Sequence, residues 1–184
     1  MINAKIGIEA IEFDVHKDLL CHCSSYFRQA LNSDFKEGIE NEVVLEEDDQ
    51  AISRIFVHFL YTDKLYENVE VLDSGDKDAR MILQQQFTEV WLLGDMRGIP
   101  ALQNAATDAI HQIVCCVSST SDSAIALVYE RPATAGPLRS LFVEYHVQCG
   151  ISPAYALMRP RPAIDFFIES MRQVQRLHVS GWRK

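Results

Sequence analysis

One junction constrains the fold more than any other feature: an alternating strand pattern runs directly into a helical one. Ile11, Phe13 and Val15 alternate with charged residues, which is the period-two pattern of a half-buried strand. After His16 the apolar residues repeat at helical spacing up to Leu31, and Ser24-Ser25 favours a break between two short helices because serine is a preferred N-cap. A purely helical or purely β fold is therefore excluded.

The next segments repeat the alternation of strand and helix. Ile6 and Ile8 continue the strand pattern backwards around Gly7, predicting a hairpin with a short first strand. A short strand is predicted at 42–45, between a loop at 32–40 and a helix at 51–60. That helix has a complete apolar face at positions i, i+3, i+4, i+7 and i+8, formed by Ile52, Ile55, Phe56, Phe59 and Leu60.

The rest of the chain has helical periodicity. Residues 67–80 are polar and indicate an exposed loop. Helical patterns follow at 87–97, 100–113, 123–130, 137–147 and 163–178, the last two separated by a proline-rich spacer. The predicted class is α+β, mainly α: a helical cluster flanked by a small sheet of about three strands, with additional C-terminal helices.

Charge is distributed unevenly along the chain. Residues 1–130 hold nine Lys and Arg against 23 Asp and Glu, whereas residues 131–184 hold eight against three. Such an acidic body would repel nucleic acid and anionic membranes, so neither is expected as a partner. Asp and Glu are concentrated within residues 34–49. This concentration indicates either a patch for a basic partner or a solvated face.

Targeting signals and cysteine usage indicate where the protein works. The N-terminal segment does not have the pattern of a signal peptide, and no apolar run reaches the ~18 residues that a membrane helix needs. There are five cysteines, an odd number. Reduced thiols in the cytoplasm, the nucleus or both are therefore expected.

Several motifs together resemble the BTB/POZ domain. They are FDVHKDLLCHCSSYFRQAL, then FKE, VVLEEDD and IFVHFLYTDKL, in the family's usual order, and VWLLGDMRGIPALQNAATDAI resembles its next helical pair. Two later segments, PLRSLFVEY and PAIDFFIES, resemble the tail common in BTB proteins of filamentous fungi. The resemblance implies a BTB/POZ-like domain at 1–115, an α-helical extension at 116–184, and a non-catalytic protein-interaction module.

The resemblance also singles out a candidate partner-binding motif, Phe35-Lys36-Glu37. It is similar to the hydrophobic-x-acidic motif with which some BTB adaptors bind a cullin-type ubiquitin-ligase scaffold. Phe35 would then supply an aromatic anchor and Glu37 a hydrogen-bond acceptor. The alternative is that Phe35 packs on its own loop and Glu37 is solvated.

Self-association is the second partner question. Family members that swap an N-terminal arm dimerise through it, and only about ten residues precede the strand at 11–15 here. The expectation is a weak homodimer, or else a monomeric fold partner like the adaptor subunits of ubiquitin ligases.

The third hypothesis is a small intracellular enzyme using Cys21 or His16. We expect no enzyme and no catalytic residue, because His16 belongs to the family's Val-His-Lys corner, where backbone groups would satisfy the imidazole. Cys21-His22-Cys23 resembles a metal tract, but helical geometry separates its thiols, so no metal or cofactor is expected.

Two further sites give the enzyme hypothesis no support. Adjacent Cys115 and Cys116 cannot share a site on a helix, and burial of these thiols is expected. The pattern suggests no Ser or Cys partner near His111 or His58.

Overall fold

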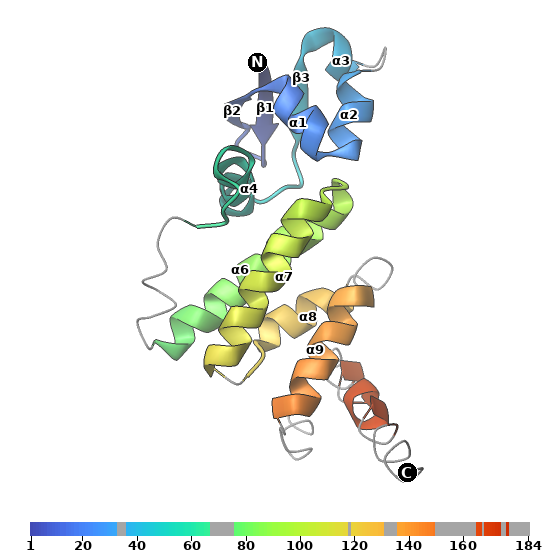
Figure 1. The fold of residues 1–184 in the computed structure, drawn as a ribbon. Helices are drawn as coiled ribbons and strands as arrows, with labels where there is room; N and C mark the ends of the chain where they lie inside the picture. The colour runs from blue at the N-terminus through green and yellow to red at the C-terminus, as the bar shows by residue number, and fades with distance from the viewer. Residues whose placement is uncertain are drawn as a thin grey trace. The chain divides into compact units, whose positions relative to one another are not determined.

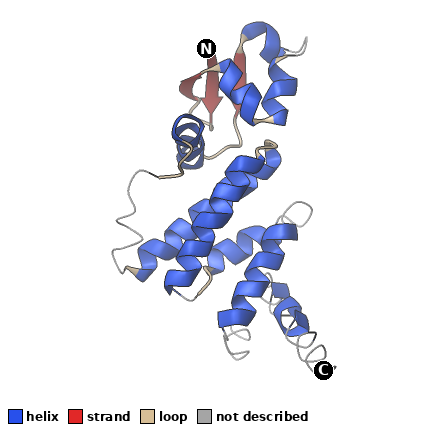
Figure 2. Cartoon of the chain, in the orientation of Figure 1, coloured by secondary structure: helices blue, strands red, loops and turns tan. Residues whose placement is uncertain are grey.

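The computed structural model describes residues 1–32, 36–66, 76–117, 119–130, 136–149, 165–166, 168–173 and 176. This part of the chain is mainly helical with one three-stranded sheet, as the ribbon shows (Figures 1 and 2). The predicted α+β class is therefore confirmed. By contact density the chain divides into two units, one of residues 1–70 and 89–108 and the other of residues 71–88 and 109–184.

The sheet has β1 (Ile2–Ile6) at its centre. β2 (Ile11–Val15) pairs with it antiparallel, and β3 (Glu42–Leu45) pairs with it parallel. The register aligns one apolar face, formed by Ile2, Ala4, Ile6, Ile11, Phe13, Val15, Val43 and Leu45. The first strand is longer than predicted and ends before Ile8, which is fully exposed in the turn because Gly7 turns the chain with a φ of 73°.

The predicted helix break at Ser24-Ser25 is confirmed. α1 (Lys17–Cys23) ends where α2 (Ser25–Leu31) begins, and the Ser24 hydroxyl accepts a hydrogen bond from the Phe27 amide at 3.1 Å. This bond satisfies an amide that would otherwise lack a partner at the start of α2. Leu20, Phe27 and Leu31 are buried, as the helical periodicity predicts.

Two loop predictions were partly wrong. Within 32–40, residues 36–40 form the short helix α3 (Lys36–Glu40). Within 67–80, residues 77–80 already belong to α6 (Lys77–Met96), because the Asp76 carboxylate accepts from the Asp78 and Ala79 amides as an N-cap. The other residues of the predicted 67–80 loop, apart from Asp76, lie outside the described residues.

α4 (Gln50–Thr62) confirms the predicted amphipathic helix. Asp49 caps it by accepting from the Ala51 and Ile52 amides. On its inner face Phe56 stacks on Phe27 of α2, with ring centroids 6.3 Å apart. The sheet and four helices contribute the side chains that meet at the centre of the first unit, which comprises residues 1–70 and 89–108. These side chains are Ala4, Ile6, Val15, Leu20, Phe27, Leu45, Phe56 and Leu93.

The turn between α6 and α7 (Pro100–Val117) is fixed against the start of α2. The Arg97 guanidinium forms a 2.7 Å ion pair with Asp48 and lies 4.7 Å from the centre of the Tyr26 ring. Gly98 has a φ of 59°, and a Cβ there would clash with the Ser25 hydroxyl, so the close approach of this turn to α2 favours glycine. Asp48, expected in a solvated acidic face, is 7% exposed and structural.

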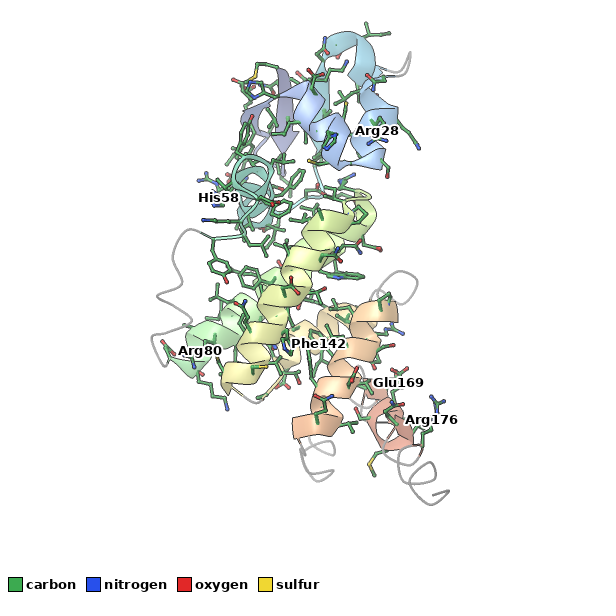
Figure 3. The ribbon with its side chains drawn as sticks, viewed as in Figure 1. Arg28, His58, Arg80, Phe142, Glu169 and Arg176 are labelled. Carbon is green, nitrogen blue, oxygen red and sulfur yellow. The ribbon has the colours of Figure 1, made fainter. Side chains whose placement is uncertain are left out.

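The second unit contains α8 (Asp122–Glu130) and α9 (Gly136–Cys149), near the predicted bounds. Residues 168–173 are helical as well, within the predicted 163–178 segment. The core of this unit includes Phe142, labelled in Figure 3, together with Leu138, Val128 and Ile113. None of the described helices is long and apolar enough to cross a membrane.

Candidate protein-interaction surface

The candidate surface is the α3 corner, which we define as residues 36–41. It follows α2 and leads into the edge strand β3. Asn41 closes the corner in the left-handed conformation, with a φ of 53°. Its carbonyl accepts from the Asn3 amide at 3.1 Å and its side-chain oxygen accepts from Lys17 Nζ at 3.5 Å. The corner is therefore anchored to β1 and to α1.

Apolar and acidic groups stand together on this corner. Ile39 is 72% exposed, Glu37 is half-buried and Glu40 is exposed. Val44, on the neighbouring strand, is 48% exposed. Phe35, the predicted aromatic anchor, lies outside the described residues. Ile39 was not singled out from the sequence, although an isoleucine two residues after Glu37 in a polar segment was a usable signal.

The acids at 34–49, which indicated either a patch for a basic partner or a solvated face, do not all lie exposed among the described residues. Besides the buried Asp48, Asp49 caps α4. Glu42 forms a 2.8 Å ion pair with Lys5 across the sheet, and this hydrogen bond raises the pKa of the Lys5 ammonium. Glu46 and Glu47 are exposed. Besides Asp49 and Glu42, the acids of this segment that stay accessible among the described residues are therefore those of the α3 corner together with Glu46 and Glu47.

His16 has a structural partner, but not the predicted one. Its ring Nδ1 lies 2.8 Å from the Tyr61 hydroxyl, and its backbone amide donates to the same oxygen at 3.2 Å. The prediction of a backbone partner was wrong, because the end of α4 brings a phenol to the strand–helix corner. One hydroxyl thus ties α4 to the start of α1.

The Cys21-His22-Cys23 tract is divided between two environments. Cys21 Sγ lies 3.8 Å from the Phe27 carbonyl oxygen, whereas burial raises the pKa of the Cys23 thiol, with a smaller contribution from Asp63. The described residues contain no group of three His, Cys, Asp or Glu that could hold a metal ion.

Sequence reasoning missed a cluster on α7. Cys115 and Cys116 are exposed, so the prediction of thiol burial was wrong. His111 Nε2 lies 3.6 Å from Cys115 Sγ, and His111 Nδ1 lies 2.9 Å from the Tyr145 hydroxyl of α9. The expectation that His111 has no cysteine partner was therefore also wrong. The signal was available, since residues i and i+4 are neighbours on a helix.

The second unit also has a polar cavity of about 550 Å³, lined by α9 and by Glu169, Arg172, Gln173 and Arg176. Its charged lining is Arg139, Glu144, Glu169, Arg172 and Arg176, of which Figure 3 labels Glu169 and Arg176. Two of these charged side chains form hydrogen bonds with α8. Glu169 accepts from the Tyr129 hydroxyl at 2.5 Å, and Arg139 donates to the Val128 and Tyr129 carbonyls at the end of α8.

The fold defines the class of protein: a small α+β module with an anchored corner on which an apolar side chain is exposed. The family comparison agrees, since the model of the BTB/POZ domain matches residues 1–112. The chain belongs to the BTB/POZ family, whose domains are protein-interaction modules.

Kelch-like proteins are among the relatives of this chain. It is 22% identical over 144 residues to Kelch-like protein 40b of Danio rerio, covering 78% of this chain and 21% of that protein. It is also 22% identical over 134 residues to Kelch-like protein 40 of Xenopus tropicalis, covering 73% and 19%. The chain thus spans about a fifth of the length of these relatives.

Proposed function

We propose that the chain is a substrate adaptor that binds a cullin-type ubiquitin-ligase scaffold through the α3 corner. The observation that carries the proposal is the pairing of Glu37 with exposed Ile39 on one anchored corner, directly after Phe35. An apolar side chain exposed beside an acid suits a partner that covers it and donates hydrogen bonds.

In this proposal two regions of the chain bind different proteins. Residues 1–115 form the recruiting module, which the family match to residues 1–112 supports. The extension at 116–184, which includes α8 and α9, is available to a second protein. Cys21, Cys23, Cys115 and Cys116 are free thiols, which fits action in the cytoplasm or the nucleus.

The test is a binding titration of the full chain against a purified cullin N-terminal domain. Glu37→Gln and Ile39→Ala should each weaken binding, by about 1–2 kcal/mol, as partner contacts do. Glu47→Gln is the matched control, because it removes the same charge from an exposed position beyond the end of β3. Equal affinity of Glu37→Gln, Ile39→Ala and wild type would refute the α3 corner as the binding site.

A further inference from the structure

A second chemical feature lies on α7, in the unit that includes residues 109–184. Ile110, Ile113 and Val114 are buried and fix which face of α7 packs inward. His111 and Cys115 stand one helical turn apart on the exposed side, with Nε2 3.6 Å from Sγ. Tyr145 of α9 is 7% exposed, and its hydroxyl lies 2.9 Å from His111 Nδ1.

These three side chains form an ordered series: an accessible thiol, an imidazole within hydrogen-bond distance of it, and a buried hydroxyl that fixes the imidazole. This is the arrangement by which a cysteine is activated, in which a base next to the sulfur is itself oriented by a third group. Tyr145 is held by the packing of α9, so its hydroxyl limits how the His111 ring can turn.

We propose that Cys115 is a covalent modification site for α,β-unsaturated carbonyl compounds, with His111 as proton acceptor and Tyr145 as a positioning residue. In the reactive tautomer the His111 Nδ1–H donates to the Tyr145 oxygen, which leaves the Nε2 lone pair facing the thiol. As the sulfur attacks, Nε2 takes the S–H proton and an S–C bond forms at the β-carbon.

The same groups complete the reaction. The π electrons of the C=C bond move to the α-carbon, which receives the proton back from the His111 imidazolium. The product is a neutral thioether, and His111 returns to its starting state. No oxidant, reductant or leaving group takes part, so the exposed thiol and the imidazole suffice.

Cys116 provides a built-in comparison. It is exposed on the same helix, about 100° further around the axis, and the described residues place no imidazole within hydrogen-bond distance of its sulfur. The angular separation within α7 also keeps the two thiols from forming a disulfide without unwinding the helix. Addition of a carbon electrophile is therefore favoured over oxidation to a disulfide.

The experiment measures site-resolved alkylation of the full folded chain by acrylamide at pH 7, using mass spectrometry. Variants Cys116→Ser and Cys115→Ser report each thiol separately. Cys115 should react at least about fivefold faster than Cys116, less than the ~100-fold that general-base catalysis contributes in enclosed enzyme sites. Equal rates for the two thiols would overturn the proposal.

Two variants test the roles of the neighbours. His111→Asn should lower the Cys115 rate to that of Cys116 and leave the Cys116 rate unchanged, and the far-UV circular dichroism spectrum should stay that of the wild type. Tyr145→Phe keeps the ring and should lower the Cys115 rate partway. A His111→Asn protein that is folded and as reactive at Cys115 as wild type would reject His111 as the base.

A spectroscopic readout isolates the positioning role of Tyr145. Nitrogen-15 spectra of labelled histidine distinguish the Nδ1–H tautomer from the Nε2–H tautomer. Wild type should hold His111 as Nδ1–H, and Tyr145→Phe should shift it toward Nε2–H. A wild-type His111 held as Nε2–H would donate to the sulfur rather than accept from it, and the proposal would fail.

Discussion

At the scale of single residues, His146 is a buried titratable side chain on α9. It is 6% exposed and its ring meets Phe166 edge-on, with centroids 4.8 Å apart. Burial lowers the pKa of this imidazole below its usual value of about 6.5. The folded protein therefore holds His146 neutral at a pH where the unfolded chain already binds a proton.

This depression predicts a pH dependence of stability. Because the unfolded state binds the extra proton, the free energy of unfolding should fall as the pH drops below about 6.5, until the folded state also protonates. His146→Leu removes the titration, so its thermal midpoint should fall less than that of wild type between about pH 7.5 and 5. Identical pH profiles for both proteins would show that His146 does not control this loss.

The environments of two residues, Asp48 and Tyr145, could not be predicted from the local sequence. The run of four acids at 46–49 indicated a solvated surface, yet Asp48 is buried against Arg97, 49 positions away. A pairing over that separation depends on how β3, α4 and α6 pack, which the local pattern does not contain. The His111–Cys115 pair was accessible from its spacing, whereas Tyr145 reaches it only through the packing of α9 on α7.

At the scale of elements, α4 tests the core most directly. Phe56 is 5% exposed and stacks on Phe27, joining α4 to α2. Phe56→Ala should lower the free energy of unfolding by about 3–5 kcal/mol, as loss of a buried aromatic does. Chemical denaturation measures this. A decrease below about 1 kcal/mol would mean that the ring is not part of the core.

The contrast between α4 and α3 shows which elements a sequence reveals. α4 has 13 residues, a complete apolar stripe and an aspartate cap, so its periodicity was decisive. α3 has five residues, too few for a helical repeat, and Gly38 lowers its intrinsic helix propensity. The start of α6 was not predicted for another reason: its first turn is polar and has no apolar repeat, and the Asp76 cap is its one sequence signal.

At the scale of the whole molecule, self-association depends on the strand edges that remain available. Both edges of β1 are paired within the chain, with β2 on one side and β3 on the other. β1 therefore offers no free edge to a second copy, and the outer strands of the sheet are β2 and β3. Exposed apolar groups such as Tyr26 on α2, which is 38% exposed, are available for weak contacts with a second copy.

We therefore expect a reversible monomer–dimer equilibrium with a dissociation constant near micromolar, corresponding to roughly −8 kcal/mol. Analytical ultracentrifugation across concentrations from well below to well above micromolar should show the average mass rise gradually. A protein that stays entirely dimeric at nanomolar concentration would contradict this expectation.

The proposed role of this BTB/POZ chain as a cullin-scaffold adaptor is tested by Phe35→Ala. A saturable complex of wild type with the cullin N-terminal domain is expected, and Phe35→Ala should weaken it by at least about 2 kcal/mol. The same substitution should change the free energy of unfolding by no more than about 0.5 kcal/mol, since a recruiting Phe35 faces the partner. Parallel melting curves and binding titrations measure both. A wild type that never binds the scaffold, or a folded Phe35→Ala protein that binds it equally well, would contradict the claim.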